Sequence, residues 1–421
     1  MAYVMVGELL RRHRLELGLT QKVIADKVGY DNTVVSRIER GELLPSEEFV
    51  TRFVDGLSLP DAEADEIWGV YRRTKEPGAN IETKRPFLTD WGEAPDVRVF
   101  YGRYEELTTL AKWLADDDCR LVSVLGMGGI GKTALAAKVA KQTAVSFDYM
   151  IWRSLRNAPP LDEILTELLQ LLSNQQEVEL PHDSEKAITK IIGYLSKHQC
   201  LLVLDNVESI MREGHAGDYR EEYWEYGRFF QRVGESDHKS HLLLTSREKP
   251  KEIGYLEGDA YPVRVMQLAG LEAVEGQQVL AAKSLSGSEL AVQSLVSHYS
   301  GNPLALNLVA EMIREVYGGH IDAFLEDDEV IFGRIGDVIG EQFARLSPLE
   351  QSLMYWLAIE REPVSRNILL KNLVIPVTKR ELMIALRSLR RRSLVEMNDA
   401  TFTLQNVVME FVTDRLIENS Y

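Results

Sequence analysis

The residues with the most specific chemistry lie in one glycine-rich stretch, Gly126-Met127-Gly128-Gly129-Ile130-Gly131-Lys132-Thr133-Ala134. Its spacing of Gly, four residues, Gly, Lys and Thr is the pattern of loops that cradle phosphates. Glycines leave the backbone free to curl, so consecutive amide N–H groups can point at one anion. The Lys132 ammonium can reach the outer phosphates, and the Thr133 hydroxyl can bind Mg²⁺. The sequence therefore predicts a phosphate-binding loop, against the plain alternative of a buried strand that ends in a flexible glycine turn.

Two further polar residues follow apolar runs of the kind that form buried strands. Asp205 follows residues 201–204, and Arg247 follows residues 242–246. A carboxylate at the end of a strand, beside the strand that leads to the phosphate loop, can hold Mg²⁺ through water. We therefore predict Thr133 and Asp205 as metal ligands and Arg247 as a contact of the terminal phosphate. The alternatives are an aspartate that caps a turn and a solvated arginine.

Alternating strands and helices must position these residues. Apolar, strand-like runs recur at 149–155, 200–204, 241–245 and 261–265, with helical stretches between them. That order predicts an α/β core in which a parallel sheet carries helices on both faces. From residue 271 the pattern becomes helical. The last part adds two short strand candidates, 394–397 and 401–404, to its helices, which is typical of a winged helix.

The N-terminal region shows helical periodicity, with two short helices expected at 21–28 and 32–40 around a turn at Gly29-Tyr30. Together with Leu19-Thr20-Gln21 and residues 35–39, this pattern resembles Xre-type helix-turn-helix domains. In that family the second helix enters the major groove of DNA. The resemblance implies that the residues facing bases or phosphates are Asn32, Thr33, Ser36 and Arg37.

Composition and charge limit the range of functions. The chain has 421 residues, 45% of them hydrophobic, and a formal net charge of −17. This charge argues against nonspecific nucleic-acid binding, so DNA contact needs a local surface. Residues 1–73 carry 10 Lys plus Arg against 13 Asp plus Glu, a net of −3, so a helical protein-interaction adaptor stays open beside DNA binding. Two distant cysteines and the lack of export or membrane-spanning signals predict a cytoplasmic protein with no membrane partner.

These patterns divide the chain into five expected parts. We predict an all-α helix-turn-helix domain at 1–74, a linker at 75–98, a P-loop NTPase domain at 99–268, a helical domain at 269–335 and a winged helix at 336–421. The linker rests on the abundance of Pro, Gly and charged residues between 75 and 97 and on the lack of a periodic apolar pattern there.

The order of motifs from about residue 100 resembles the NB-ARC branch of the STAND signal-transduction ATPases. The matching pieces are Gly102-Arg103, the phosphate loop, residues 147–155, the strand ending at Asp205, residues 245–247, 301–306 and 402–410. In that family ADP locks a closed form, and exchange for ATP opens it for homo-oligomerisation. The resemblance implies that the remaining contacts of ADP or ATP are Tyr101 and Arg103 beside adenine, Pro303 and Leu304 against the base, and Gln405 near the β-phosphate.

Three departures from that family matter. Asn206 replaces a second acid that orients the attacking water, so hydrolysis should be slow or rely on Glu208. Gln405 lies where the family has the histidine of a Met-His-Asp motif, and it cannot carry charge, which weakens the ADP lock. No repeat array is found, so we expect a sensor or effector protein supplied in trans, or a shortened paralogue.

The sequence thus predicts a nucleotide-dependent switch with a helix-turn-helix output domain. We favour a transcriptional regulator as its function. The alternative is an oligomerising defence or cell-death scaffold whose first domain recruits a partner. A third hypothesis, an energy-coupling ATPase, requires rapid turnover; the catalytic candidates for any turnover are Asp205, Asn206, Glu208 and Arg247.

Overall fold

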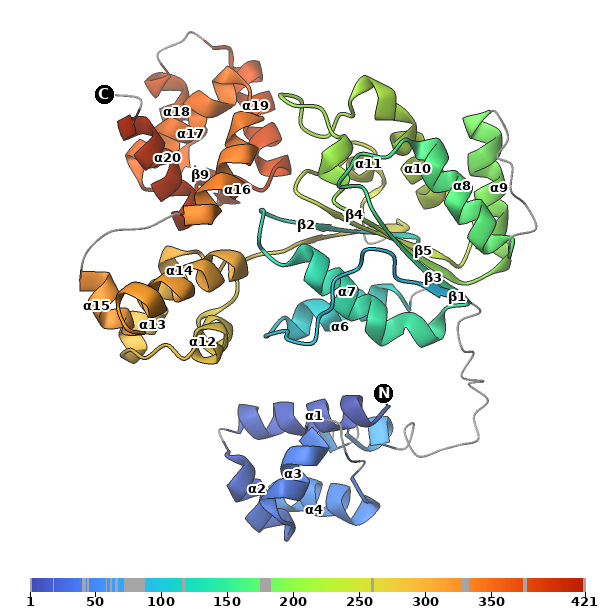
Figure 1. Ribbon diagram of the computed structural model, residues 1–421, viewed down its shortest axis with the longest axis vertical. Coiled ribbons are helices and arrows are strands. Elements are labelled where there is room, and N and C mark those ends of the chain that lie inside the picture. The colour runs from blue at the N-terminus through green and yellow to red at the C-terminus, as the bar shows by residue number, and fades with distance from the viewer. Residues whose placement is uncertain are drawn as a thin grey trace. The chain divides into compact units, whose positions relative to one another are not determined.

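The computed structural model describes residues 2–17, 19–39, 43, 45–57, 59–60, 63–64, 67–71, 88–115, 119–174, 183–258, 261–326, 333–373 and 377–418. The chain divides into two compact units, residues 1–83 and 84–421 (Figure 1).

The first unit is a small helical bundle. Its helices are α1 Ala2–Glu16, α2 Gln21–Val28, α3 Asn32–Glu39 and α4 Glu47–Leu57. The Thr20 side chain caps α2 by accepting from the Val23 amide, and Gly29 ends that helix in the left-handed conformation, with φ 70°. The two predicted helices are confirmed; residue 40, the expected end of the second, lies outside the described residues.

A buried ion pair joins three of these helices. The Arg14 guanidinium of α1 donates to both carboxylate oxygens of Glu39 in α3, at 2.6 and 2.9 Å. Gln21 of α2 donates to the same carboxylate at 2.7 Å, and Arg14 also donates to the Leu19 carbonyl at 2.8 Å. The side chains of Arg14 and Glu39 are almost fully buried. Each charge therefore needs the other, because water cannot solvate it.

We predict that Arg14→Met destabilises the first unit by about 3 kcal/mol, because it leaves the Glu39 carboxylate buried without a countercharge. Calorimetry of the full chain should show the transition of this unit moving to lower temperature. Glu48→Gln is the matched control, since its pair with Arg52 is exposed and contributes at most about 1 kcal/mol. Equal shifts of the transition temperature in both variants would contradict the view that the buried Arg14–Glu39 pair matters more than an exposed one.

The second unit is built on a parallel sheet of six strands in the order β1-β3-β4-β5-β2-β6. The strands are β1 Leu88–Asp90, β2 Leu121–Leu125, β3 Tyr149–Ser154, β4 Cys200–Asp205, β5 His241–Ser246 and β6 Val263–Gln267. The helices connecting them are α6 Tyr104–Trp113, α7 Lys132–Thr143, α8 Leu161–Leu172, α9 Ser184–Lys197, α10 Trp224–Glu235 and α11 Ile253–Leu256. The predicted α/β fold class is confirmed.

Both faces of this sheet are buried, as the apolar runs require. Side chains alternate along each strand, so Leu202 and Leu204 of β4 join the core beneath α8, α9 and α10, whereas Leu201 and Val203 join the core beneath α6 and α7 (Figure 1). Every strand predicted in this part of the chain is present, within two residues of its expected ends.

Three positional predictions were wrong. The linker expected at 75–98 cannot extend to residue 98, because Leu88–Asp90 is strand β1 and pairs with β3; residues 72–87 lie outside the described ranges. The strand that ends at Asp205 is not beside β2, because β5 lies between them. The boundary expected between residues 335 and 336 falls inside helix α16, Gly333–Ala344.

Two further groups of elements follow the sheet. The helical segment, residues 269–326, contains α12 Ala273–Ala282, α13 Glu289–His298, α14 Pro303–Val316 and α15 Ile321–Glu326. The C-terminal segment, residues 333–418, contains α16, α17 Pro348–Glu360, α18 Arg366–Asn372, α19 Lys379–Arg391 and α20 Asn406–Glu418, with the antiparallel sheet β7-β9-β8. Its strands are β7 Val364–Ser365, β8 Glu396–Asn398 and β9 Thr401–Thr403. One continuous apolar core joins both segments.

The C-terminal segment is fixed to the sheet by buried charges. Arg392, which follows α19, donates to Glu248 Oε1 at 2.6 Å, and Arg345 lies 3.2 Å from the same oxygen. Arg392 and Glu248 are 2% and 3% exposed. Burial raises the pKa of Glu248, while the two arginines oppose that rise. Within the described residues, no helix is both long and apolar enough to cross a membrane.

Candidate functional site

The phosphate loop has the backbone that its glycines allow. Gly129 and Gly131 adopt φ of 78° and 100°, in the left-handed region that other residues rarely occupy. A Cβ added at Gly128 would lie 2.5 Å from Val338 Cγ1 and 3.3 Å from Arg247 Cζ. The loop therefore has a backbone conformation that needs glycine, and Val338 and Arg247 pack against it at Gly128. A side chain larger than hydrogen does not fit at Gly128.

Lys132 is buried at the first position of α7. Its ammonium donates to the carbonyls of Gly126 and Met127 at 2.9 and 3.0 Å, so the side chain curls back over the loop. Burial lowers the pKa of Lys132 to about 8, and the charges of Glu208 and Asp205 act against that effect while Arg247 adds to it. Lys132 is thus a largely protonated cation at neutral pH inside the glycine loop.

The ends of β4 and β5 and the start of α7 form a cluster of oxygen atoms beside this lysine. The Thr133 hydroxyl donates to Asp205 Oδ1 at 2.8 Å, and the Thr245 hydroxyl at the end of β5 donates to the same oxygen. Asn206 donates its side-chain amide to Asp205 Oδ2 at 3.0 Å. Burial raises the pKa of Asp205 despite these hydrogen bonds. Asp205 reaches Thr133 although β5 lies between β4 and β2, and Thr245 of β5 bonds to the same carboxylate oxygen.

The Thr133–Asp205 pair fits the chemistry of Mg²⁺. Among the described residues, no group of three or more His, Cys, Asp or Glu side chains is arranged to hold a metal. Mg²⁺ bound with nucleotides commonly takes one or two protein oxygens and completes its shell with phosphate and water. A hydroxyl and a carboxylate in contact beside the loop match that requirement.

Arg247 is held beside the loop by an acid. Its Nε lies 3.0 Å from Glu208 Oε1, and its backbone N–H donates to Glu208 Oε2 at 3.2 Å. The guanidinium also lies 3.6 Å from Glu341 Oε2 of α16. Two cations, Lys132 and Arg247, therefore border the glycine loop, each within the field of buried carboxylates, and such a donor set suits a polyanion.

The helical segment reaches the loop through Asn302, which the sequence analysis missed. Its side-chain amide donates to the Gly128 carbonyl at 3.0 Å, while its Oδ1 accepts from the amides of Leu304 and Ala305 and so caps α14. Asn302 is fully buried. An Asn directly before a Pro at a helix start is an N-cap signal, so the sequence did contain a clue.

The start of α14 carries the two other predicted residues to the same loop. The Leu304 amide donates to the Gly129 carbonyl at 3.3 Å, and the nearest atom to a Cβ added at Gly131 is Pro303 Cγ, at 4.0 Å. The C-terminal segment adds Gln342 of α16, whose Oε1 accepts from the Gly128 amide at 3.3 Å. No pattern in the sequence pointed to Gln342.

Arg103 is buried in this structure and bonds to the backbone of the phosphate loop. It is 4% exposed, and its guanidinium donates to the carbonyls of Ala269 and Ile130 at 2.6 and 3.3 Å and to Glu106 at 2.8 Å. Tyr101, also predicted beside adenine, packs against the apolar core of the helical and C-terminal segments. Arg103 thus links the phosphate loop to the start of the helical segment.

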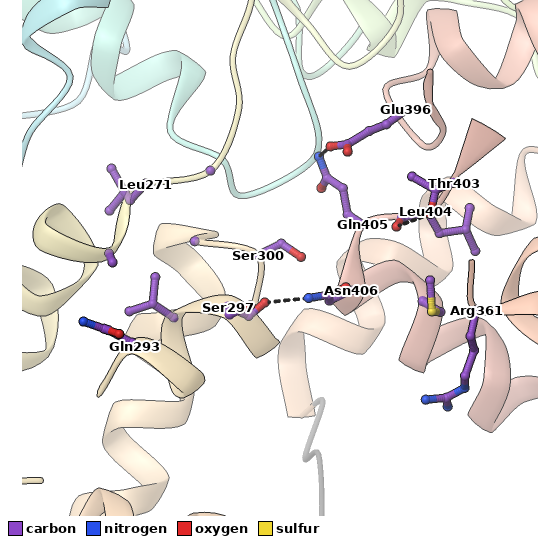
Figure 2. Close-up of a pocket in the computed structure, with 15 residues that line it drawn as sticks. Leu271, Gln293, Ser297, Ser300, Arg361, Glu396, Thr403, Leu404, Gln405 and Asn406 are labelled. Carbon is purple, nitrogen blue, oxygen red and sulfur yellow. Dashed lines mark hydrogen bonds between the residues drawn. The ribbon is translucent and has the colours of Figure 1, made fainter. Parts of the chain in front are cut away.

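Gln405 lies in a different pocket, of about 470 Å³, between the helical and C-terminal segments (Figure 2). Its amide donates to Glu396 Oε1 at 2.9 Å rather than to the loop. Beside it, Asn406 donates to the Ser297 carbonyl at 3.1 Å, joining α20 to α13. The structure therefore does not bring Gln405 together with Lys132.

Comparison with known sequences identifies the domain that holds this site. The sequence model of the NB-ARC domain matches residues 103–269. This chain carries an NB-ARC domain. A helix-turn-helix domain model matches residues 6–67, so the NB-ARC domain follows an N-terminal helix-turn-helix domain, as predicted.

Relatives share parts of this arrangement. The chain is 47% identical, over 343 residues, to an uncharacterised WD repeat-containing protein of Nostoc sp., a match that covers 78% of the chain and 27% of the relative. It is 27% identical over 113 residues to a putative disease resistance RPP13-like protein of Arabidopsis thaliana, covering 25% of the chain and 13% of that protein. The chain thus spans about a quarter or less of these relatives.

A solved structure shares the fold of much of this chain. A Walker-type ATPase of Pyrococcus abyssi aligns with a TM-score of 0.50 and 15% identity, over 76% of this chain and 99% of that one. At this identity the match shows the fold alone. A P-loop NTPase fold implies nucleotide binding, which agrees with the glycine loop and Lys132.

The predicted DNA-contacting residues share one side of α3 in the helix-turn-helix domain. Asn32, Thr33 and Arg37 are exposed and Ser36 is half-buried. Asp31 precedes the helix, and hydrogen bonds from Thr33 lower the pKa of its carboxyl, so a negative charge lies at the helix start. The surface is accessible, but it is not strongly basic.

We predict that Asn302→Ala destabilises the second unit by about 2 kcal/mol or more, because it removes a helix cap and leaves the buried Gly128 carbonyl without its donor. Asn307→Ala is the matched control, since Asn307 lies in the same helix and bonds only to its own turn. Denaturant unfolding of both variants provides the measurement. If both variants lose the same free energy of unfolding, the hydrogen bond from Asn302 to the Gly128 carbonyl contributes nothing to stability.

Proposed function

We propose that this protein is a switch whose state is set by ADP or ATP in the NB-ARC domain and is passed to the helix-turn-helix domain. The observation that carries the proposal is the phosphate loop itself, which contacts three parts of the chain. Lys132 and Asp205 belong to the NB-ARC domain, Asn302 to the helical segment and Gln342 to the C-terminal segment. A ligand bound there acts on all three.

Each residue has a role that follows from its chemistry. The loop amides and Lys132 would bind the inner phosphates, and Thr133 with Asp205 would hold Mg²⁺, which neutralises phosphate charge when bound. Arg247 would contact the terminal phosphate of ATP, for which it must exchange its pairing with Glu208. Pro303 and Leu304 would border the nucleotide from the helical segment.

Slow hydrolysis follows from the same contacts. A general base must accept a proton from the attacking water. Asn206 has no basic atom and orients Asp205, while both oxygens of Glu208 contact Arg247. Glu208 becomes available only when Arg247 leaves it. The bound nucleotide, rather than its turnover, is therefore the proposed signal.

We predict that the wild-type protein retains ADP or ATP through purification and that Lys132→Ala does not. Nucleotide released by denaturing the protein can be identified by ion-exchange chromatography, and the affinity of added ADP can be measured by calorimetry. Lys138→Ala is the control, because Lys138 lies on the same helix and contacts Phe100 instead of the loop. An unchanged ADP affinity in Lys132→Ala would refute the phosphate-binding role.

For the output we propose sequence-selective DNA binding through α3. The match to a helix-turn-helix domain and the exposed side of α3 support it. A scaffold function in defence is the second candidate. It is favoured by the net charge of −3 over residues 1–73 and by similarity to part of a disease resistance protein. In that case ATP would promote homo-oligomers and a partner protein supplied in trans would be recruited.

We predict that Arg37→Ala weakens selective DNA binding by at least about tenfold and lowers its salt dependence, because Arg37 lies on the exposed side of α3. Selection from a random operator library, in both nucleotide states, would identify the target for fluorescence anisotropy. Arg11→Ala removes an exposed charge from α1 and serves as the control. If the wild type selects no sequence in either state, the scaffold function replaces the regulator.

A further inference from the structure

Residues 366–391 of the C-terminal segment carry a positive charge that contrasts with the rest of the chain. They contain seven Lys or Arg against one Glu, a net of +6, whereas the whole chain has a net charge of −17. The stretch includes the helices α18 and α19 (Figure 1). A protein of this overall charge can contact nucleic acid only through such a local surface.

One face of α19 presents most of these cations to solvent. Its opposite face, with Leu382, Leu386 and Leu389, is buried in the apolar core. The exposed side chains are spaced by three or four residues and so share one side of the helix: Lys379, Arg380, Met383, Ile384, Arg387 and Arg390. The face therefore has cations at both ends and two apolar side chains in the middle.

The positive charges of this face are not neutralised by neighbouring acids. Among the described residues, none of Lys379, Arg380 and Arg387 forms an ion pair. The one acid of α18 and α19 is Glu381, whose carboxylate accepts from the amide and the hydroxyl of Thr378 at 2.7 and 2.8 Å. Those hydrogen bonds lower the pKa of Glu381 and hold its charge at the start of α19. The rest of the face stays positive.

Two arginines at the edge of this face contact sulfur atoms. Arg366 of α18 donates to Met383 Sδ at 3.7 Å, and Arg390 donates to Met397 Sδ at 3.6 Å. A thioether is a weak, uncharged acceptor, so both guanidinium groups keep their positive charge and further donors for an anion.

The C-terminal end of α19 is anchored to the NB-ARC domain. Arg391 donates to the Ala216 carbonyl at 3.4 Å, and its own carbonyl accepts from the Lys249 amide at 3.0 Å. Burial and, next, the charge of Arg387 lower the pKa of Arg391, as expected where positive charges lie close together. The exposed part of the face is therefore residues 379–390.

The dimensions of this face suit the major groove of duplex DNA. A helix rises 1.5 Å per residue, so the cations at the two ends lie about 15 Å apart along α19. The major groove is about 12 Å wide and admits a helix. Cations at both ends can therefore meet phosphates on both sides of the groove, and the apolar middle can contact thymine methyl groups. Arginine, the commonest cation here, binds phosphate through a planar set of donors.

An acidic peptide is the other polyanion to consider. Peptides that bind through apolar side chains need a groove to seat them. The pocket of about 470 Å³ in the same segment is lined by no residue of α19, and Ile384 projects with 58% of its surface exposed. The geometry therefore favours DNA.

We propose that the exposed face of α19 is a DNA-binding surface separate from α3, which contacts the phosphates of duplex DNA through Arg380, Arg387 and Arg390. Because it acts through charge, its binding is salt-sensitive and largely independent of base sequence. It lies in the second unit and needs neither bound nucleotide nor sequence selection by α3. It therefore goes beyond the switch function proposed above.

The test measures binding of the full chain to a fluorescent DNA duplex of mixed sequence, by anisotropy over a range of salt concentrations. Arg387→Gln should weaken binding by about threefold to tenfold and make the slope of log affinity against log salt shallower by about one, since it removes one phosphate contact. Arg314→Gln is the matched control, because it removes the same charge from an exposed position on α14.

Two variants of Ile384 separate charge from shape. Ile384→Glu places a negative charge in the middle of the face and should weaken binding by more than about tenfold, because it repels the phosphates on both sides. Ile384→Ala should stay within about threefold of wild type, since it leaves the phosphate contacts intact. Ile384 is exposed, so neither change opens a cavity, and unchanged thermal unfolding would show that both variants are folded.

The outcomes distinguish this surface from the functions proposed above. If the wild type does not bind the duplex, or if Arg387→Gln and Arg314→Gln bind it with the same affinity and salt slope, the inference is overturned and the switch function is untouched. If polyglutamate binds as tightly as the duplex, the face is a site for acidic proteins and the inference is also overturned. If Arg387→Gln weakens binding but Arg37→Ala does not and no sequence is selected, the inference stands and the regulator function fails.

Discussion

The buried ammonium of Lys132 is the constraint on which the rest of the second unit depends. A cation placed out of water needs acceptors and opposite charge; here the loop carbonyls accept from it, and the negative charges of Asp205 and Glu208 favour its protonated form. These groups lie at or just after the ends of β2 and β4, which the parallel sheet brings to one edge. The six-stranded sheet is therefore the scaffold that makes a buried positive charge, and hence a phosphate site, tolerable.

The same loop is where the three parts of the second unit meet. Asn302 donates to the Gly128 carbonyl and Gln342 accepts from the Gly128 amide, so the backbone of one residue is bonded to two different segments. Farther from the loop, Arg392 and Glu248 form a buried ion pair between the C-terminal segment and the residue after Arg247. Arg247 is therefore the direct neighbour in sequence of Glu248, one partner of this ion pair. This arrangement connects the loop to elements that are distant in sequence.

The first unit also depends on buried charge. Arg14 and Glu39 are charged groups buried in a small core, and they join α1 to α3. Because this pair fixes the orientation of α3, it also fixes which side of that helix, with Asn32 and Arg37, stays exposed. Buried charge in both units therefore acts less as a source of stability than as a means of holding one arrangement.

The sequence by itself determined the elements and the chemistry of the loop. The spacing from Gly126 to Thr133 defines a phosphate cradle locally, and the apolar runs define strands buried on both faces, because these signals depend on neighbours in the chain. Only the tertiary structure decided the strand order that places β5 between β4 and β2, the strand at Leu88–Asp90, the pairing of Gln405 with Glu396, and the approach of Gln342 to Gly128. Those contacts join residues up to 214 positions apart. Such pairs leave no local pattern, since what brings them together is the packing of whole segments rather than the properties of either residue.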